Sequence, residues 1–335
     1  MPEPMRIKAK RLFWAFLKLT FVVSLIFTFT GFFGQFSHWL DLTSHFRVQY
    51  ALILLFGLIW QFRNRTISHK PGLLLITALA LVINGWQVWQ YASPQPYYQP
   101  KGPGHALKLL QVNVFVYNKR YQAVEAMIRQ AGADVVSLQE INARWYQHLK
   151  DSPVFKQYPY HLLHLEAGNV LLSRFPLLNS NLVHFPEDTM GKVLYRNEGG
   201  YFLTHIQLGN NTVSLINLHP PVPFNPRHAA SYQRYLNLLV AEKANLTPSV
   251  IVFGDLNTTP WSHYYREYLR ALGLKDAKAH HYMPTWPVYI PCFFIPIDHV
   301  LVSRNIQTVR QSVGPFNGSD HLPVEITLWI PGNSR

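Results

Sequence analysis

Three long apolar stretches occupy the first 91 residues and restrict most strongly what this chain can fold into. They read "LTFVVSLIFTFTGFFG" (19–34), "VQYALILLFGLIWQF" (48–62) and "GLLLITALALVINGWQVWQY" (72–91). About 20 apolar residues cross a bilayer core; the third stretch has this length, and the first has it when residues 12–18 are added. The second is short, and a tilted span, a re-entrant segment and a core helix are all compatible with it. We expect residues 1–91 to be a membrane anchor with about three transmembrane helices.

Basic residues around these stretches predict an orientation, because positively charged loops stay in the cytoplasm. Only Arg47 lies between the first two stretches. The N-terminus and the second loop are richer in basic residues, namely Arg6, Lys8, Lys10 and Arg11, and Arg63, Arg65 and Lys70. With three spans, the chain after residue 91 lies outside the cytoplasm; if the second stretch does not cross, this topology reverses. A cleaved signal peptide is disfavoured, since no small-x-small site follows the first stretch.

Composition separates the anchor from the rest of the chain. The net charge is +13, but residues 1–91 hold nine Lys and Arg against two Asp and Glu, and the remaining residues hold 21 against 15. The excess outside the anchor is therefore modest, which disfavours nucleic acid as a partner without excluding it. The single Cys292 excludes an intramolecular disulfide. Residues 92–106, "ASPQPYYQPKGPGHA", form a Pro- and Gly-rich linker.

Residues 107–335 mix hairpin strands with helical crossovers. Helical patterns cover 119–131, 226–246 and 262–272, and apolar runs predict strands at 107–116, 134–140, 169–173, 201–208, 212–219, 249–257, 297–303 and 322–330. This mixture indicates an α/β or α+β sandwich rather than a doubly wound sheet.

Polar residues recur at the ends of these strands. Taken singly, these residues have an ordinary explanation, because Asn and Asp cap turns. That explanation is weaker for Glu140, because an acid at the end of a buried strand needs a partner. The residues in question are Asn113, Glu140, His219, Asp255, Asn257, Asp298, His299, Asp320 and His321. All of them in this order are unlikely to arise by chance, and they predict one polar site.

The order of these motifs resembles the endonuclease/exonuclease/phosphatase (DNase-I-like) superfamily of metal-dependent phosphoesterases. The matching stretches cover nearly all of 107–330 and are "LQVNV", "VVSLQEIN", "GNVLLSRFPL", "INLHP", "VIVFGDLNTTP", "PIDHVLVS" and "GSDHLPV". The resemblance implies a four-layer sandwich: two mixed β-sheets face to face, flanked by helices. The "TWP…PIDHVLVS" pattern behind several spans is most similar to membrane-anchored bacterial members linked to teicoplanin resistance and polyprenyl-phosphate metabolism.

The resemblance also implies a role for each strand-end residue. Glu140 corresponds to the metal-binding glutamate, with Asn113 beside it and Asp320 as a further metal-associated carboxylate. Phe115 stands where some members carry another acid, which puts a second metal in doubt. We expect His299 to be structural. The catalytic residues implied are Asp255 and Asn257 at the attacking water, His219 and His321 bracketing the phosphate, and Asp298 orienting His321.

The implied chemistry is the attack of water in line with the leaving group at phosphorus, without a covalent intermediate. A hard cation with oxygen ligands neutralises the non-bridging oxygens, so Mg²⁺ is the expected cofactor, with Mn²⁺ as a substitute. A general base and a general acid serve the water and the leaving oxygen.

The substrate is not fixed by the family. Residues 281–299 are rich in aromatic residues and proline, which fits either a packed loop or an apolar lip meeting lipid, with Trp286 contacting substrate. Residues 219–228 offer Arg227 as a phosphate contact. We expect a membrane-anchored hydrolase of a lipid-linked or other envelope phosphate, in the bacterial inner membrane with a periplasmic catalytic domain. An extracytoplasmic nuclease and a catalytically silent anchored binding module are the alternatives.

Overall fold

The computed structural model describes residues 3–63, 71–93, 97–184, 200–277 and 282–332. These residues divide into two compact units. The first comprises residues 1–93 with Trp261–His263, and the second comprises Pro94–Pro260 with Tyr264–Arg335. Each unit is described on its own below.

The first unit is helical. Its elements are α1 (Glu3–Thr30), the 3₁₀ helix η1 (Gly31–Phe36), α2 (His38–Leu42), α3 (Arg47–Arg63) and α5 (Pro71–Ala92). Among the described residues, two helical segments, Met5–Phe36 and Pro71–Ala92, are long and apolar enough to cross a membrane, judged by length and composition. The second apolar stretch forms α3, a helix of 17 residues. That these helices anchor the chain in a membrane remains a prediction.

Buried polar side chains connect three helices of this unit. Arg47 of α3 donates to the Thr28 carbonyl of α1 at 2.7 Å. Asn84 of α5 donates to the Thr28 hydroxyl at 2.7 Å. Because unpaired polar groups are costly in an apolar environment, these bonds satisfy the polar groups where the helices meet.

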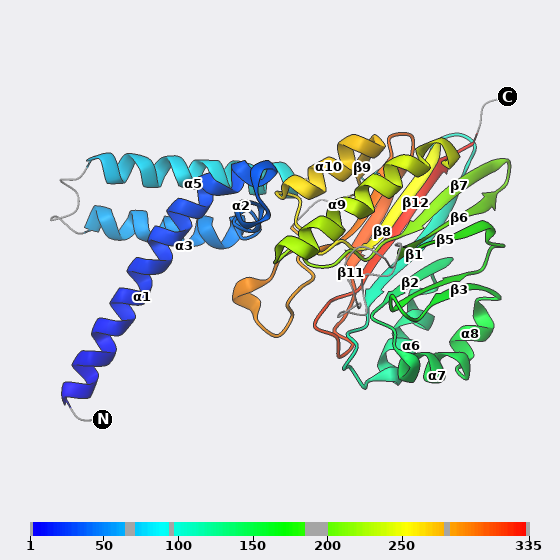
Figure 1. Cartoon of the computed structure of the whole chain (residues 1–335), viewed down its shortest axis with the longest axis horizontal. Coiled ribbons are helices and arrows are strands. Elements are labelled where there is room, and N and C mark those ends of the chain that lie inside the picture. The colour runs from blue at the N-terminus through cyan, green and yellow to red at the C-terminus, as the bar shows by residue number, and fades with distance from the viewer. Residues whose placement is uncertain (1–2, 64–70, 94–96, 185–199, 278–281, 333–335) are drawn as a thin grey trace. The chain divides into compact units, whose positions relative to one another are not determined.

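The second unit is a sandwich of two β-sheets, with six strands in each sheet among the described residues (Figure 1). Sheet A has the order β11 (Gln307–Val313), β12 (Val324–Pro331), β1 (Gly104–Asn113), β2 (Val135–Gln139), β4 (Asn169–Ser173), β3 (Tyr160–His164). Sheet B has the order β5 (Leu178–His184), β6 (Gly200–Leu208), β7 (Asn211–Asn217), β8 (Ser249–Asp255), β10 (Asp298–Ser303), β9 (Leu274–Asp276). β1 and β2 pair in parallel, as do β7 and β8, and the other neighbours are antiparallel.

Helices cover the outer face of each sheet, which confirms the expected four-layer sandwich (Figure 1). On sheet A they are α6 (Tyr121–Ala131), α7 (Ala143–Lys150) and α8 (Pro153–Gln157); on sheet B they are α9 (Pro226–Ala241) and α10 (His263–Leu272). The helix expected at 226–246 ends at Ala241 and continues as the 3₁₀ helix η3 (Glu242–Asn245). A further 3₁₀ turn, η4 (Pro291–Phe293), precedes β10.

The space between the sheets changes character along the strands. Side chains alternate between the two faces of a strand, so every second residue points toward the other sheet. In β1, Leu107 and Leu109 belong to the core between the sheets, and the next inward positions are Gln111 and Asn113. In β8, Ile251 and Phe253 likewise belong to this core, and the next inward position is Asp255. The sandwich is therefore apolar at one end and polar at the other, where the predicted site lies.

Candidate active site

One buried carboxylate, that of Asp255 at the end of β8, lies at the centre of the polar end. Its Oδ2 atom is 3.5 Å from His219 Nε2 and 3.6 Å from His321 Nε2. Asn113 donates its amide to the same oxygen at 3.0 Å. The Asn257 backbone N–H donates to Oδ1 at 2.8 Å. The structure thus brings five of the predicted site residues together, from both sheets.

Gly254, directly before Asp255, allows the strands to approach closely. Its φ is +149°, and a Cβ atom there would lie 1.9 Å from the Leu218 carbonyl oxygen. Glycine is therefore required for β8 to place Asp255 beside the residues that follow β7.

His321 is held between two carboxylates. Asp298 opens β10 directly opposite Asp255 in the register of the two strands. Its Oδ2 atom is 2.9 Å from His321 Nδ1, while His321 Nε2 faces Asp255. All three side chains are buried. Asp298 therefore contacts the His321 ring, and its role in orienting that ring for catalysis remains a prediction.

Glu140 follows β2 in a backbone conformation that few residues adopt. Its φ is +62°, and φ at Asn257 is +49°. The Glu140 carboxylate accepts from the Asn113 amide at 3.0 Å and from the Val116 backbone N–H at 2.9 Å. Left-handed φ at a residue other than glycine costs about 1–3 kcal/mol and is concentrated at functional positions. Both residues were predicted to belong to the site.

Asp320 interacts with Trp286. The indole Nε1–H donates to Asp320 Oδ2 at 3.0 Å, and the Trp286 ring centroid is 6.3 Å from that of His321. Within the described part of the chain, Asp320 Oδ1 is buried without a hydrogen-bond partner. Burial raises the pKa of Asp320, and the charge of Glu140 adds to this effect while that of His321 opposes it. Trp286 therefore forms part of the wall of the site.

Several carboxylate and imidazole groups of the site offer ligand atoms for a divalent cation. Asp255, Asp298 and His321 have possible ligand atoms within 4.8 Å of one another, a grouping found in a search of the described residues. Hydrogen bonds already occupy Asp298 Oδ2 and His321 Nδ1. Glu140 and Asp320, by contrast, repel each other, and Asp320 has the buried oxygen without a partner. Asp320 therefore has a carboxylate oxygen available for a hard cation, while the expected binding of the metal by Glu140 and Asp320 remains a prediction.

Asn113 bridges the two carboxylates through its nitrogen. Its Nδ2 atom donates to both Glu140 and Asp255, and its Oδ1 atom accepts from the Phe115 backbone N–H at 3.0 Å. In this arrangement Asn113 presents donors rather than a free oxygen. Its expected contribution to metal binding remains a prediction.

Two further predicted residues lie outside this cluster of contacts. His299 is buried, and its Nε2 atom is 2.9 Å from the Thr258 carbonyl oxygen, in keeping with a structural role. Arg227 lies in the first turn of α9. Its expected contact with phosphate remains a prediction.

Polar residues that the sequence analysis did not single out support the cluster from behind. Ser319 donates its hydroxyl to the Asn113 carbonyl at 2.7 Å and accepts from the His321 backbone N–H at 3.0 Å. The others lie on the inward faces of the strands and are Gln111, Ser137, Gln139 and Asn217. The sequence feature that could have identified these residues is a polar residue in an otherwise apolar strand.

The ionisation of the central groups follows from their contacts. Burial alone lowers the pKa of His321, but the carboxylates of Asp298 and Asp255 outweigh it and raise that pKa to about 10. Burial opposes ionisation of Asp255, but the charge of His321 and the hydrogen bond with His219 prevail and lower its pKa. Burial likewise lowers the pKa of His219, but the Asp255 contact raises it overall. The contacts therefore favour an anionic Asp255 beside a protonated His321, and they raise the pKa of His219.

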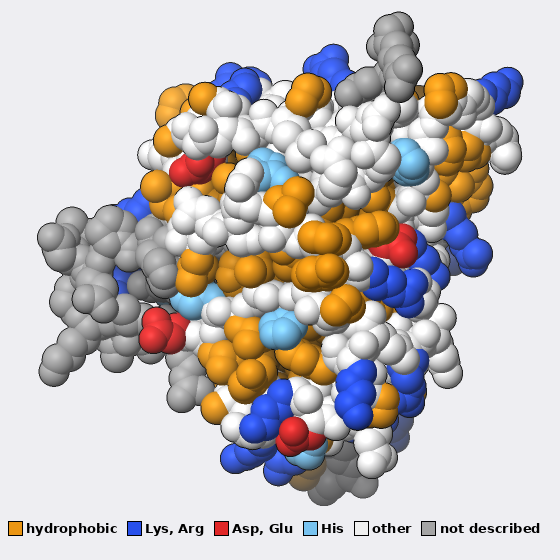
Figure 2. All heavy atoms as spheres, turned by 90° about the vertical axis from the view of Figure 1, so that its right-hand side faces the viewer, with side chains coloured by type: hydrophobic (Ala, Val, Ile, Leu, Met, Phe, Trp, Pro, Cys, Tyr) orange, Lys and Arg blue, Asp and Glu red, His pale blue; other side chains and the backbone are white. Residues whose placement is uncertain are grey.

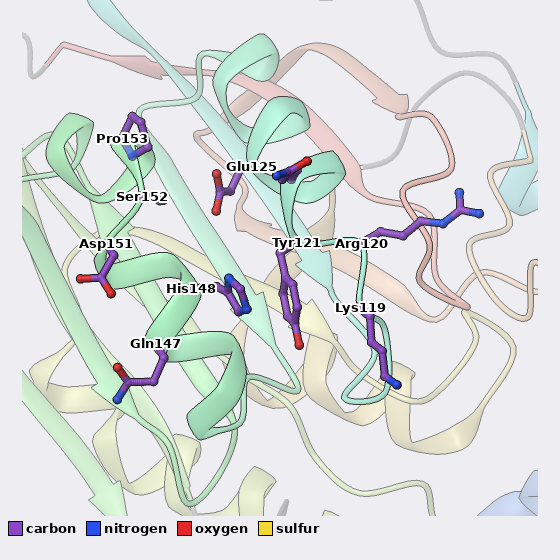
Figure 3. Close-up of a pocket in the computed structure, with 10 residues that line it drawn as sticks. Lys119, Arg120, Tyr121, Glu125, Gln147, His148, Asp151, Ser152 and Pro153 are labelled. Atoms are coloured by element: carbon purple, nitrogen blue, oxygen red, sulfur yellow. The ribbon is translucent and has the colours of Figure 1, made fainter.

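A separate groove lies near the N-terminal end of α6. It has a volume of about 650 Å³ and is lined by residues including Arg120, Tyr121, Glu125 and His148. Figure 3 shows the Tyr121 and His148 rings facing each other, and their centroids are 3.8 Å apart. None of the predicted catalytic or metal-binding residues lines this groove.

The pKa of His321 predicts how stability changes with pH. A group whose pKa is raised on folding stabilises the protein fully below its unfolded pKa, near 6.5, and this contribution is lost as the pH rises toward about 10. We expect the melting temperature of the metal-free wild type in EDTA to fall between pH 7 and 9.5 more steeply than that of His321→Asn. Parallel curves for the two proteins would contradict the assigned charge.

Comparisons with known proteins identify the family and the fold. The model of the Endonuclease/Exonuclease/phosphatase family matches residues 110–321. A search of curated proteins finds no significant match. Among solved structures, a beta toxin variant from Staphylococcus aureus with bound magnesium ions is 18% identical, with a TM-score of 0.54, and the match covers 66% of this chain and 99% of the toxin.

Two other solved structures have the same fold. Sphingomyelinase C from Streptomyces griseocarneus is 20% identical, with a TM-score of 0.50 and coverage of 67% of this chain and 99% of the enzyme. A humanized D. rerio TDP2 is 16% identical, with a TM-score of 0.51 and coverage of 67% and 98%. At these identities the likeness concerns the fold. Since the family model covers most of the chain and contains every residue of the site, this protein belongs to the endonuclease/exonuclease/phosphatase family.

Proposed function

We propose that this protein is a membrane-anchored, metal-dependent phosphoesterase that hydrolyses a lipid-linked or other envelope phosphate outside the cytoplasm. The family supports the coarser class, a phosphoesterase-type hydrolase. The observation that carries the proposal is the position of Asp255 between His219 and His321, with Asp298 behind His321. This arrangement supplies negative charge for a water and positive charge for a phosphate within one buried cluster.

Each group has a defined task in the proposed reaction. Asp255, with Asn257 beside it, orients the attacking water and accepts its proton as the new P–O bond forms. His219 and His321 donate hydrogen bonds to the phosphate oxygens, and one of the two supplies the proton that the leaving oxygen takes up. Charge-assisted donors fixed before the reaction lower the barrier most where charge develops. Asp298 keeps His321 oriented and protonated.

Glu140 and Asp320 would hold the divalent cation, and Asn113, which donates its amide to Glu140 and to Asp255, would hold the Glu140 carboxylate in place. Such a cation, when bound, neutralises charge on the phosphate oxygens. The solved beta toxin with bound magnesium ions has the same fold, which supports Mg²⁺ as the cation to test first.

Exposed apolar side chains near the site residues in the sequence support a lipid-linked substrate. We call them the apolar rim. They lie in the loops that carry or flank the site residues, and they are Tyr117, Val222, Phe224, Tyr289, Ile290, Phe293 and Phe316. Side chains of this kind at a surface fit the boundary between headgroups and acyl chains.

Contacts connect this rim to the loop that precedes Asp320 and His321. Tyr289 packs edge to face on Phe316 with a centroid distance of 5.8 Å and donates its hydroxyl to the Gly318 carbonyl at 2.8 Å. The Arg120 guanidinium lies over the Phe316 ring at 5.5 Å. An aromatic surface with a cation beside it suits the headgroup region of a phospholipid, and it also suits stacked bases, so DNA has to be tested as a substrate.

Charge distribution disfavours the nuclease alternative. Nucleic-acid binding depends on many Lys and Arg contacts to phosphates. Residues 92–335 hold 21 Lys and Arg against 15 Asp and Glu, so their positive excess is modest. On the face shown in Figure 2, the right-hand side of Figure 1 where β12 ends, Lys and Arg side chains are scattered around apolar ones. A D. rerio TDP2 with this fold was solved with a single-stranded DNA product, so DNA belongs in the substrate panel.

The first test measures activity. Full-length protein in detergent with Mg²⁺ is assayed against polyprenyl phosphates, phospholipids, and single- and double-stranded DNA. We expect release of phosphate from the lipid-linked ester, abolition by EDTA, and a loss of at least about 100-fold in turnover for His321→Ala and Glu140→Ala. The exposed His161→Ala and Glu166→Ala are matched controls. Hydrolysis of DNA alone would establish the nuclease, and no hydrolysis of any ester would favour the binding module.

The apolar rim gives a second prediction. Burying a phenylalanine side chain contributes about 1.5–3 kcal/mol, so Phe293→Ser should raise KM about tenfold or more for a long-chain polyprenyl phosphate in mixed micelles. The rate on the same phosphate carried by a short, water-soluble chain should not change. Leu178→Ser, an exposed apolar residue of β5, is the control. An equal effect on both substrates would contradict a role in lipid contact.

The topology gives a third prediction. A reporter enzyme that is active only outside the cytoplasm, fused after Ala92, should be active in a bacterial host. A second fusion after Arg65, in the predicted cytoplasmic loop, should be inactive. The opposite pattern would place the catalytic domain in the cytoplasm and bring soluble phosphates and nucleic acid forward as substrates.

A further inference from the structure

Gln111 occupies the boundary between the apolar core and the site. It lies on the inward face of β1, between Leu109 and Asn113, and is 1% exposed. Its Nε2 atom donates to Asp298 Oδ1 at 2.8 Å and to Gln139 Oε1 at 2.8 Å. One amide group therefore joins Asp298 of sheet B to the residue that directly precedes Glu140 in sheet A.

The bonds continue beyond Gln139. Its amide donates to the Ser137 hydroxyl at 2.5 Å, and the Asn217 amide donates to the same hydroxyl. Asn217 ends β7, shortly before His219. The buried chain of polar groups thus runs beneath Asp298, Glu140 and His219 and connects the strands that carry them.

A polar residue at position 111 requires a reason, because buried polar groups cost free energy unless they are hydrogen-bonded. Leu107 and Leu109 fill the preceding inward positions, so an apolar side chain at 111 would extend the core. Instead, among the described residues, Gln111 Oε1 is buried without a hydrogen-bond partner. The orientation of the amide is nonetheless fixed, since rotating it would place Oε1 against the Asp298 carboxylate.

Asp298 explains what Gln111 contributes. Its Oδ2 atom contacts His321 Nδ1, and its Oδ1 atom accepts from Gln111. A buried carboxylate oxygen left without a donor costs free energy, which favours rotation of the carboxylate toward other donors, and the imidazole bonded to it would follow. Gln111 therefore holds the carboxylate in the rotamer that aims His321 Nε2 at Asp255.

We propose that Gln111 is a positioning residue for the reaction: its amide fixes Asp298, and through Asp298 the His321 ring, relative to the strands that carry Glu140 and His219. The effect on turnover rests on the proposed phosphoesterase function. The effect on the His321 ring does not.

The kinetic test uses Gln111→Met, which keeps the length of the side chain and removes its donors. We expect kcat to fall about 10–100-fold, as for other residues that orient a site from behind, with KM within about threefold of wild type. In an Asp298→Asn background the same substitution should have almost no further effect, because Gln111 acts through Asp298. Gln311→Met, at a buried position of β11, is the matched control and should leave kcat unchanged.

A second readout does not require turnover. With histidine labelled by ¹⁵N, the hydrogen-bonded Nδ1–H of His321 should give a low-field proton resonance, identified by its loss in His321→Gln. We expect Gln111→Met to shift or broaden this resonance, while Gln311→Met leaves it unchanged. If Gln111→Met does not fold, Gln111→Leu, which removes the donors and continues the apolar positions of Leu107 and Leu109, replaces it in both experiments.

The outcomes separate the two proposals. A wild-type protein that hydrolyses no ester refutes the proposed function, and the His321 resonance then decides the role of Gln111 alone. A kcat for Gln111→Met within threefold of wild type, an equal loss in the Asp298→Asn background, or an unchanged His321 resonance would overturn the positioning role.

Discussion

The attraction between one buried carboxylate and two imidazole groups is the interaction on which the site depends. Asp255 is 1% exposed, and burial of a lone carboxylate would keep it protonated. The contacts with His219 and His321 reverse this preference and also hold both rings close to one oxygen atom. The charges are mutually dependent, so loss of any one leaves the others buried and uncompensated.

The fold supplies this cluster through a change in composition along its central strands. The inward residues are apolar at one end, as with Leu107 and Ile251, and polar at the other, as with Asn113 and Asp255. The apolar end packs the sheets together and the polar end holds the reacting groups. Stability and chemistry are therefore provided by the same strands, with Gln111 at the boundary between them.

Much of this could be predicted from the sequence, because the informative residues directly follow or precede apolar runs. The strand at 169–173 was predicted with its observed bounds. The strand-end residues also lie together, as the contacts of Asn113 with Asp255 and of His321 with Asp298 show. Short or polar elements were missed. β11, with the sequence "QTVRQSV", lacks an apolar alternation, and α8 is only five residues long.

The supporting residues could not be assigned from the sequence, for a physical reason. Whether Gln111 or Gln139 faces the partner sheet or a covering helix depends on strand register and on which face packs on which layer. The sequence pattern gives the alternation but does not identify the partner across the sandwich. The bond between Gln111 and Asp298 joins strands of different sheets, 187 positions apart in the chain, so only the folded structure reveals it.

The central claim is that Asp255 organises the attack of water on a phosphate ester, and the isosteric variant Asp255→Asn tests it most directly. The substitution keeps the size of the side chain and removes the charge that holds both histidines. We predict that the folded variant, assayed with Mg²⁺ on the best substrate of the wild type, loses turnover by at least about 1,000-fold. Turnover within tenfold of the wild type would contradict the account.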